Sequence, residues 1–508
     1  MEPLLEKLNA QQKEAVQTTQ GPLLVVAGAG SGKTLVLTHR IAYLILEKGV
    51  HPSRILAVTF TNKAANEMKE RIARILKERR SSSAADSLHM GTFHSVCLKI
   101  LRAHADVLGL TPRFVIFDEK DQLALIKTVC EELGVDTERF APELFVHTIS
   151  KLKSRLVNPH TFQGVGVNPF SRALEKVYPR YQQALAEHDA VDFDDMIGRT
   201  VELLEKDRAL REHYQRLFLH VLIDEYQDTN FAQVRLANIL ARAHRNLCAV
   251  GDLDQAIYSF RQADISNMLD FEKEYPDAKV VLLEENYRST QNILSAANTI
   301  IAKNKLRKEK NLFTRNKEGA KIEGVMTAHE GREAEFVART IKGLAKKKKL
   351  SLSDIAVLYR TNAQSRAIEE TFIRARIPYV MLGGLKFYER KEVKDMLAYL
   401  RFLLNPKDVM SLKRIVGVPP RGIGKVSLAR FLERQEKTKE MGKFLLLMDS
   451  FRKEARHSPL SRLVKHIAKQ SGLERHLTQG TEDERVRWEN VRELVSAASH
   501  YDSLDPQD

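Results

Sequence analysis

The chain has 508 residues, and its 81 Lys and Arg against 66 Asp and Glu give it a formal net charge of +15. Its three cysteines lie far apart without Cys-x-x-Cys or Cys/His spacing, which argues against a disulfide framework and a zinc site. There is no run of about 20 apolar residues, and the early acidic residues argue against a signal peptide. We therefore expect a cytoplasmic protein with no membrane partner.

The excess of positive charge suggests a polyanionic partner, and nucleic acid is the first candidate. The alternative is a globular protein that happens to be basic. Charge alone leaves both interpretations open.

The N-terminal part of the chain alternates strand and helix patterns. Helical sequence at 33–49 and 62–80 follows the first two apolar runs, and a serine-rich loop is expected at 81–87. Between about 114 and 190 helical periodicity dominates, which predicts a helical insertion. Strands are predicted at 22–27, 54–60, 218–223, 247–251 and 279–283. This alternation predicts an α/β fold with a parallel sheet covered by helices on both faces.

A second alternating block follows. Strands are predicted at 321–328 and 354–360, and helices at 333–349 and 363–377. Beyond residue 383 the pattern is mostly helical. A Gly-Ile-Gly turn at 422–424 either presents backbone N–H groups to duplex phosphate or simply connects two helices.

The stretch AGAGSGKT lies between the first strand and the first long helix, which is the context of a phosphate-binding P-loop. Glycines let the backbone wrap phosphates closely, and a helix N-terminus attracts the anion. Lys33 would reach the β- and γ-phosphates and Thr34 would bind Mg²⁺. The alternative is a glycine-rich turn without a ligand. The candidate residues are Ala27, Gly28, Ala29, Gly30, Ser31, Gly32, Lys33 and Thr34.

An acidic pair follows the predicted strand at 218–223. Asp224 would hold Mg²⁺ directly or through water, and Glu225 would act as general base toward the attacking water. An acidic turn after a strand is the alternative. In a chain with a P-loop, two carboxylates at this point favour the catalytic interpretation.

Ten sequence blocks in this order resemble the UvrD/Rep/PcrA family of superfamily-one DNA helicases, and together they cover nearly the whole chain. They are 8–16, 27–34, 56–68, 91–95, 192–196, 223–229, 250–263, 283–290, 357–366 and 383–401.

The resemblance implies two RecA-like cores, each a parallel sheet with helices on both faces and each carrying a mainly helical insertion. The closing blocks of the second core do not occur before Asp508, so we expect that core to be incomplete. The implied boundaries are 1–113 and 191–281 for the first core, 114–190 for its insertion, 282–380 for the second core, and 381–508 for a truncated second insertion.

The resemblance also implies roles around ATP. Gln12 would read the adenine edge, and Tyr287 would stack on the base. Gln255 would sense the γ-phosphate, and Arg288 would act as an arginine finger from the second core. A planar, permanently charged guanidinium suits that last role because it stabilises charge that spreads over the transferring phosphoryl group.

A single-stranded DNA track needs aromatic side chains for the bases and cations for the backbone. Taken alone, Phe60 and Phe193 are better explained as core residues than as a DNA platform, and His94 as a packed structural residue. The residues that the resemblance implies are Phe60, Asn62, His94, Phe193, Tyr258, Phe260 and Arg261, with Arg360 and Asn362 in the second core.

The sequence thus predicts an ATP- and Mg²⁺-dependent 3′-to-5′ helicase or translocase acting on single-stranded DNA and on junctions with duplex. Repair or replication proteins would be its partners. Two alternatives stay open. One is a truncated ATP- and DNA-binding module with little or no unwinding activity, and the other is an ATPase that acts on protein.

Overall fold

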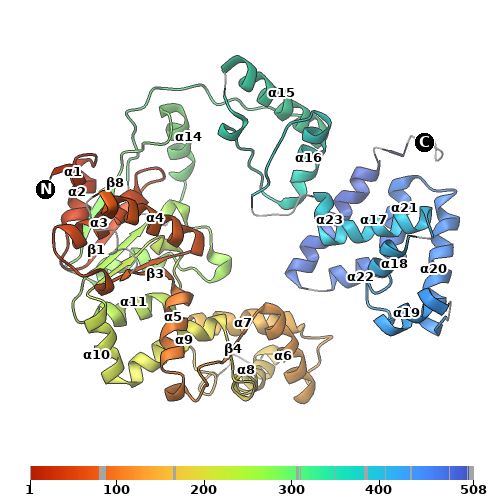
Figure 1. Ribbon diagram of the computed structural model, residues 1–508, viewed down its shortest axis with the longest axis horizontal. Coiled ribbons are helices and arrows are strands. Elements are labelled where there is room, and N and C mark those ends of the chain that lie inside the picture. Colours follow the sequence, from red (N-terminus) through yellow and green to blue (C-terminus); the bar gives the residue numbers. More distant parts are fainter. Residues whose placement is uncertain are drawn as a thin grey trace. The chain divides into compact units, whose positions relative to one another are not determined.

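The computed structural model describes residues 2–78, 87–163, 168–304, 308, 310–348, 350–382, 387–406, 408–434, 437–479, 481–499 and 501–502. The chain divides into two compact units, Met1–Ile322 and Glu323–Asp508, coloured red to green and teal to blue in Figure 1. The loop predicted at 81–87 lies outside the described residues except for its last residue.

The first unit is built on a six-stranded sheet with the order β3-β2-β6-β7-β1-β8, in which every neighbouring pair is parallel. All five strands predicted in this part of the chain are confirmed, and with them the α/β class. Strand β3 was missed because its four residues, HMGT, show no apolar run. The strands are β1 (Leu23–Ala27), β2 (Ile55–Thr59), β3 (His89–Thr92), β6 (His220–Ile223), β7 (Leu247–Gly251) and β8 (Lys279–Leu283).

Helices cover both faces of this sheet, which is why β1, β2, β6 and β7 are buried along their whole length and read as continuous apolar runs. Each face has its own hydrophobic core. On one face lie α2 (Ala10–Gln17), α3 (Lys33–Leu46) and α4 (Asn62–Glu78), preceded by α1 (Glu2–Leu5). On the other lie α5 (Phe93–Ala103), α9 (Phe193–Lys206), α10 (Arg208–Leu217) and α11 (Phe231–Ala241).

The carboxyl ends of the parallel strands lie at one edge of the sheet, where open α/β folds bind their ligands. The loop after β1 leads into α3. After β6 the chain forms the 3₁₀ turn Tyr226–Asp228, and after β7 it forms the 3₁₀ turns Leu253–Gln255 and Ser259–Arg261. Short helices α12 (Ser266–Leu269) and α13 (Phe271–Glu274) then return the chain to β8.

The helical pattern predicted at 114–190 corresponds to α6 (Glu119–Glu132), α7 (Pro142–Ser154) and α8 (Pro169–Glu187), which share a separate hydrophobic core. A two-stranded parallel sheet, β4 (Val115–Phe117) with β5 (Ala190–Asp192), joins the two ends of this segment. Three-residue strands are too short to show alternation, so the sequence pattern did not predict them.

Residues beyond β8 continue in the first unit through α14 (Gln291–Ile301) to Ile322. The division between the two compact units falls after Ile322, and the predicted start of the second core at residue 282 stays a prediction. Described residues that follow β8 bond back to the P-loop and to one another. Asn286 Nδ2 donates to the Ala29 carbonyl at 2.6 Å, and Glu285 forms a β-bridge with Phe313.

The described part of the second unit is helical. Its two hydrophobic clusters are formed mainly by α15 and α16, and by α17 to α23. The helices are α15 (Glu330–Lys348), α16 (Ser365–Arg374), α17 (Lys391–Leu404), α18 (Val409–Ile415), α19 (Lys425–Arg434), α20 (Lys439–Ala455), α21 (Leu460–Gln470), α22 (Leu473–Thr478) and α23 (Glu482–Ser499).

The strands predicted at 321–328 and 354–360 are wrong. Neither segment takes part in a sheet within the described chain, and the side chains of Met326 and Leu358 are 99% and 92% exposed. A strand of a parallel sheet is stabilised by the ladder on its neighbours, and these two segments have no such neighbour among the described residues.

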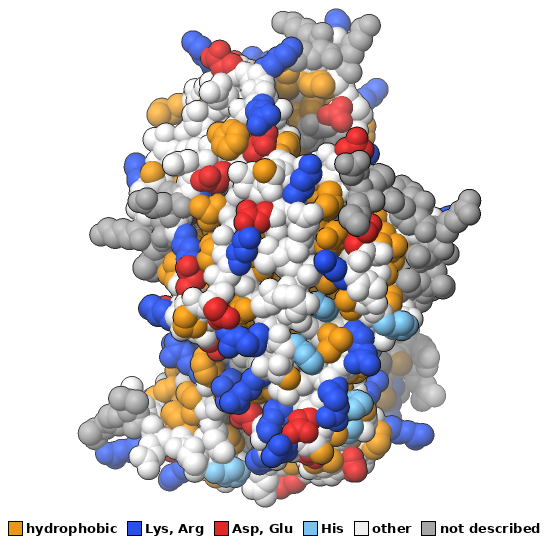
Figure 2. Space-filling view, turned by 90° about the vertical axis from the view of Figure 1, so that its left-hand side faces the viewer, with side chains coloured by type: hydrophobic (Ala, Val, Ile, Leu, Met, Phe, Trp, Pro, Cys, Tyr) orange, Lys and Arg blue, Asp and Glu red, His pale blue; other side chains and the backbone are white. Residues whose placement is uncertain are grey.

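Figure 2 shows one face of the molecule, on which Lys and Arg side chains alternate with Asp and Glu and become denser toward its lower end. Helix α10, which lies low in Figure 1, carries Arg208, Arg211 and Arg216. Among the described helices, none has the length and apolar character that a bilayer-spanning helix requires.

Candidate active site

The loop between β1 and α3 has the conformation that a phosphate cradle requires. Gly30 and Gly32 have φ values of 67° and 90°, a left-handed region that strains any residue with a Cβ. Gly32 is the N-cap of α3, so the free N–H groups of the helix start directly at Lys33. The Ser31 hydroxyl donates to the Gly28 carbonyl at 2.8 Å and holds the turn closed.

Three sequence blocks meet at Lys33. Its Nζ donates to Glu225 Oε2 at 3.0 Å and to Gln255 Oε1 at 3.4 Å. Lys33 and Glu225 are 192 positions apart in the chain. The structure therefore brings together the lysine, the carboxylate and the glutamine that the sequence had assigned to one reaction.

The acidic pair occupies the end of β6. The backbone N–H of Asp224 donates to the Val58 carbonyl at 2.9 Å, which anchors this turn to β2. Burial and, to a smaller extent, the nearby charge of Glu225 raise the pKa of Asp224 to about 7, against the opposing effect of Lys33. Glu225 has φ 50°, a conformation that costs energy for a residue with a Cβ and is typical of functional turns.

Among the described residues, no group of three or more His, Cys, Asp or Glu has the geometry to hold a metal ion. The predicted Mg²⁺ ligands, Thr34 and Asp224, fit another kind of site. Mg²⁺ usually takes one or two protein oxygens and completes its shell with water and substrate phosphates. The charged form of buried Asp224 is disfavoured in the protein alone, so a cation there would offset that cost.

A buried lysine that the sequence pattern did not reveal, Lys310, holds Gln255 in place indirectly, through Asp252. Lys310 Nζ pairs with Asp252 Oδ1, and with Asp254 Oδ2 at 3.0 Å. The other oxygen of Asp252 accepts from Gln255 Nε2 at 2.6 Å. The side chains of Lys310 and Asp252 are each 2% exposed, so this ion pair is a fixed part of the site.

The residues expected at the nucleoside are placed around the same loop. Gln12 is buried, and its Nε2 donates to the Ser31 carbonyl at 3.0 Å. The Tyr287 ring is half exposed, and its hydroxyl donates to Glu285 at 2.9 Å and accepts from Asn9 at 2.8 Å. Contacts of Gln12 and Tyr287 with adenine stay predictions.

The segment after β8 packs directly on the P-loop. A Cβ at Gly30 would lie 2.8 Å from the Arg288 Cβ, so this position excludes a larger residue, whereas a Cβ at Gly28 would lie 2.0 Å from the end of the Leu312 side chain, which would have to move. Arg288 therefore lies in the same compact unit as the phosphate loop. Its role as an arginine finger stays a prediction.

An aromatic cluster follows the Gln255 turn. The ring centroids of Phe60 and Tyr258 are 4.7 Å apart, and those of Tyr258 and Phe260 are 5.8 Å apart. The Arg261 guanidinium lies 5.6 Å from the Tyr258 centroid and 5.8 Å from the Phe260 centroid. Phe260 is 67% exposed, which leaves a flat apolar face and a cation open to a ligand.

A second aromatic site lies at the start of α9. Phe193 is 48% exposed, so it is not a core residue, and its ring meets the His94 ring edge-on at 5.8 Å. Burial lowers the pKa of His94. Asn62 is exposed at the first position of α4.

The two candidates in the second unit, Arg360 and Asn362, have exposed side chains. The Asn362 carbonyl accepts from Arg390 Nη2 at 2.9 Å, which ties its backbone to the segment before α17. DNA contacts at both residues stay predictions.

The phosphate loop, the acidic pair and Gln255 define a P-loop nucleotide-binding protein with its site at the carboxyl edge of a parallel sheet. A family profile described as the UvrD/REP helicase N-terminal domain matches residues 8–276, and one described as the UvrD-like helicase C-terminal domain matches residues 281–508. The chain belongs to this family of ATP-dependent DNA helicases, as the ordered sequence blocks had indicated.

Among its relatives is the ATP-dependent DNA helicase PcrA of Staphylococcus aureus (strain Mu50), 44% identical over 528 aligned positions that cover 100% of this chain and 72% of the relative. The protein of the same name from Staphylococcus epidermidis (strain RP62A) has the same identity and coverage.

Proposed function

We propose that this protein hydrolyses ATP to move 3′-to-5′ along single-stranded DNA and to open junctions with duplex, in DNA replication or repair. The observation that carries the proposal is the meeting of Lys33, Glu225 and Gln255 at the P-loop. The names of the relatives, which are DNA helicases, support DNA as the partner. Replication or repair proteins are the further partners that this function implies.

The ion pair between Lys33 and Glu225 suggests how ATP prepares the site. A bound triphosphate draws Lys33 to its β- and γ-phosphates, which breaks the ion pair with Glu225 and leaves that carboxylate with its hydrogen bond from Gln227. Glu225 then accepts a proton from the water that attacks the γ-phosphorus, as the bond to the ADP oxygen breaks. Thr34 and Asp224 would hold Mg²⁺, which neutralises phosphate charge when it is bound.

Gln255 is suited to transmit this event. Its amide nitrogen is held by Asp252, while its amide oxygen contacts Lys33, so it responds when Lys33 moves. Three residues later, Tyr258 begins the aromatic cluster with Phe60, Phe260 and Arg261. We propose that this short connection links the state of the nucleotide to the stacking of a base.

Replacing Glu225 by Gln tests the general base. The variant keeps a polar partner for Lys33 but cannot take up the proton, so kcat for DNA-stimulated hydrolysis is expected to fall by about 10²- to 10⁴-fold with ATP affinity retained. Phosphate release and nucleotide titration measure the two quantities. Glu14→Gln, which alters a half-exposed carboxylate paired with Lys279, is the matched control and should leave both unchanged. A wild-type kcat in Glu225→Gln would assign the base elsewhere.

Salt dependence tests the DNA track. If three to five phosphates are contacted, the log–log plot of single-stranded DNA affinity against salt should have a slope of about −2 to −4, at about 0.7 per contact. Arg261→Ala should make the slope less steep by about 0.7, whereas Arg208→Ala on α10 should not alter it, since Arg208 pairs with Glu212 on the surface. A flat response in the wild-type chain would contradict a backbone-tracking groove.

A second candidate function is an ATP- and DNA-binding module with little or no unwinding. It is favoured by the unpaired segments 321–328 and 354–360, because a motor needs two rigid cores. A strand-separation assay on residues 1–508 distinguishes the two, since unwinding by this chain would exclude the module. If DNA had no effect on the ATPase rate, an ATPase acting on protein would be favoured over both.

A further inference from the structure

A buried ion cluster connects the helical insertion to the start of α9. Lys153 on α7 places Nζ 2.6 Å from Asp192 Oδ2 and 2.9 Å from Asp195 Oδ1, and its side chain is only 5% exposed. The two carboxylates are 1% and 8% exposed. Tyr181 donates to Asp192 Oδ2 at 3.0 Å, and Gln182 donates to Asp195 Oδ2 at 2.9 Å. One lysine therefore neutralises a site with two buried carboxylates.

This cluster controls a helix start. Asp192 is the N-cap of α9, and its Oδ1 accepts from the backbone N–H of Asp195 at 2.8 Å. One oxygen of Asp192 therefore caps the helix while the other is held by Lys153. The next residue, Phe193, is the first of the helix and projects its half-exposed ring beside His94. A rotation of Asp192 would break the cap and redirect Phe193.

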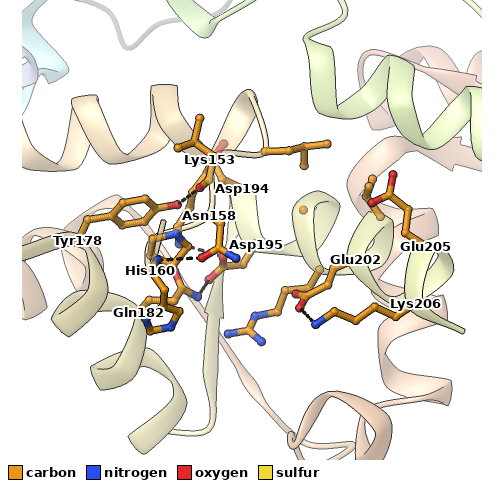
Figure 3. A pocket seen from close by; sticks show the side chains of 16 residues that line it. Lys153, Asn158, His160, Tyr178, Gln182, Asp194, Asp195, Glu202, Glu205 and Lys206 are labelled. Atoms are coloured by element: carbon orange, nitrogen blue, oxygen red, sulfur yellow. Dashed lines mark hydrogen bonds and ion pairs between the residues drawn. The ribbon is translucent and has the colours of Figure 1, made fainter. Parts of the chain in front are cut away.

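A cavity of about 380 Å³ borders the cluster, and Lys153 and Asp195 are among its lining residues. Close packing does not confine the Asp195 carboxylate on that side, so its position depends on its ion pair with Lys153. Figure 3 shows the two sides of the cavity, with Lys153, Tyr178, Gln182, Asp194 and Asp195 on one and Glu202, Glu205 and Lys206 on the other.

We propose that Lys153 is a positioning residue for DNA: through Asp192 it sets the direction of Phe193, on which a base of single-stranded DNA stacks. The inference rests on the proposed function. It gives the helical insertion a specific role. Lys153 on α7 fixes the orientation of Phe193 in the neighbouring core through Asp192, and Lys153 itself does not contact DNA.

The test is a mutant cycle on the full chain with an oligo(dT) probe, measured by fluorescence anisotropy. Lys153→Met removes the cation. Because that variant removes the lysine that pairs with two buried carboxylates, Lys153→Met/Asp192→Asn is the second form, in which Asn keeps the helix cap. Each form is combined with Phe193→Ala. Stacking of one base on an aromatic ring corresponds to roughly a 5- to 100-fold change in affinity. We expect a loss in this range for Phe193→Ala and for Lys153→Met, and a smaller loss for the double change, in which the cap is kept.

In the Phe193→Ala background, the Lys153 changes should cause no further loss, and nucleotide affinity should stay at its wild-type value throughout. Additive losses, or a parallel loss of nucleotide affinity, would overturn the positioning role while leaving the proposed function intact. Unchanged DNA affinity in Phe193→Ala would overturn both the platform and the inference. Arg180→Met, which breaks a more exposed pair with Glu132 in the same insertion, is the matched control and should leave oligo(dT) binding unchanged.

Discussion

Replacing Lys33 by Ala is expected to abolish DNA-stimulated ATP hydrolysis, with kcat/KM falling by about 10²-fold or more. Lys33 lies where the phosphate loop, the acidic turn and the Gln255 turn meet. A cation next to the charge that develops on the phosphoryl group lowers the activation barrier by several kcal/mol, and an alanine at this position cannot provide that stabilisation. The same change removes the ion-pair partner of Glu225. The release of Glu225 by ATP binding, which we propose prepares it as the general base, is then lost as well.

A coupled phosphate-release assay with and without single-stranded DNA measures this effect. Lys48→Ala is the matched control, because Lys48 is an exposed lysine just beyond the end of the same helix, α3. We expect its rate to equal that of the wild type. Retention of DNA-stimulated hydrolysis by Lys33→Ala would show that the nucleotide is processed somewhere other than this loop.

Replacing Lys310 by Met is expected to lower the free energy of unfolding by about 3–5 kcal/mol, because it removes the cation that pairs with the buried Asp252 carboxylate. Asp252 and Asp254 both contact Lys310, and Asp252 is as buried as the lysine itself. A methionine has similar length but cannot neutralise either charge. The resulting repulsion acts at the end of β7, in the middle of the sheet.

Urea unfolding followed by circular dichroism measures the loss. Lys273→Met, which breaks a surface pair between an 81% exposed lysine and Asp270, should change stability by no more than about 0.5 kcal/mol. The double change Lys310→Met/Asp252→Asn should recover part of the loss, since one unpaired charge is gone. A wild-type unfolding midpoint in Lys310→Met would contradict the structural role of this pair.

The Lys310→Met variant also allows its effect on ATP hydrolysis to be measured separately from its effect on folding. Asp252 orients Gln255 through a 2.6 Å hydrogen bond, so a displaced Asp252 should lower the response of the ATPase to DNA even at temperatures where the variant is folded. Leu312, close to Lys310 in the chain, and Arg288, near the start of the same segment, also pack on the phosphate loop. Described residues between β8 and Ile322 thus pack against the residues of the phosphate site and hold them in place.

The sequence by itself determined the features that depend on neighbouring residues. Strands β1, β2, β6, β7 and β8 could be predicted because buried parallel strands are continuous apolar runs. The P-loop could be predicted because left-handed backbone at Gly30 and Gly32 admits few other residues. The family could be identified because ten such local blocks occur in a fixed order.

Only the tertiary structure decided the contacts between distant residues. Lys153 and Lys310 resemble surface lysines in the sequence, yet they meet carboxylates 39 and 58 positions away and become buried. Segments 321–328 and 354–360 have the composition of strands but pair with no strand in the described part of the chain, because strand formation depends on partners as well as on propensity. Local chemistry therefore located the phosphate site, whereas burial and long-range charge pairing decided which residues hold it in place.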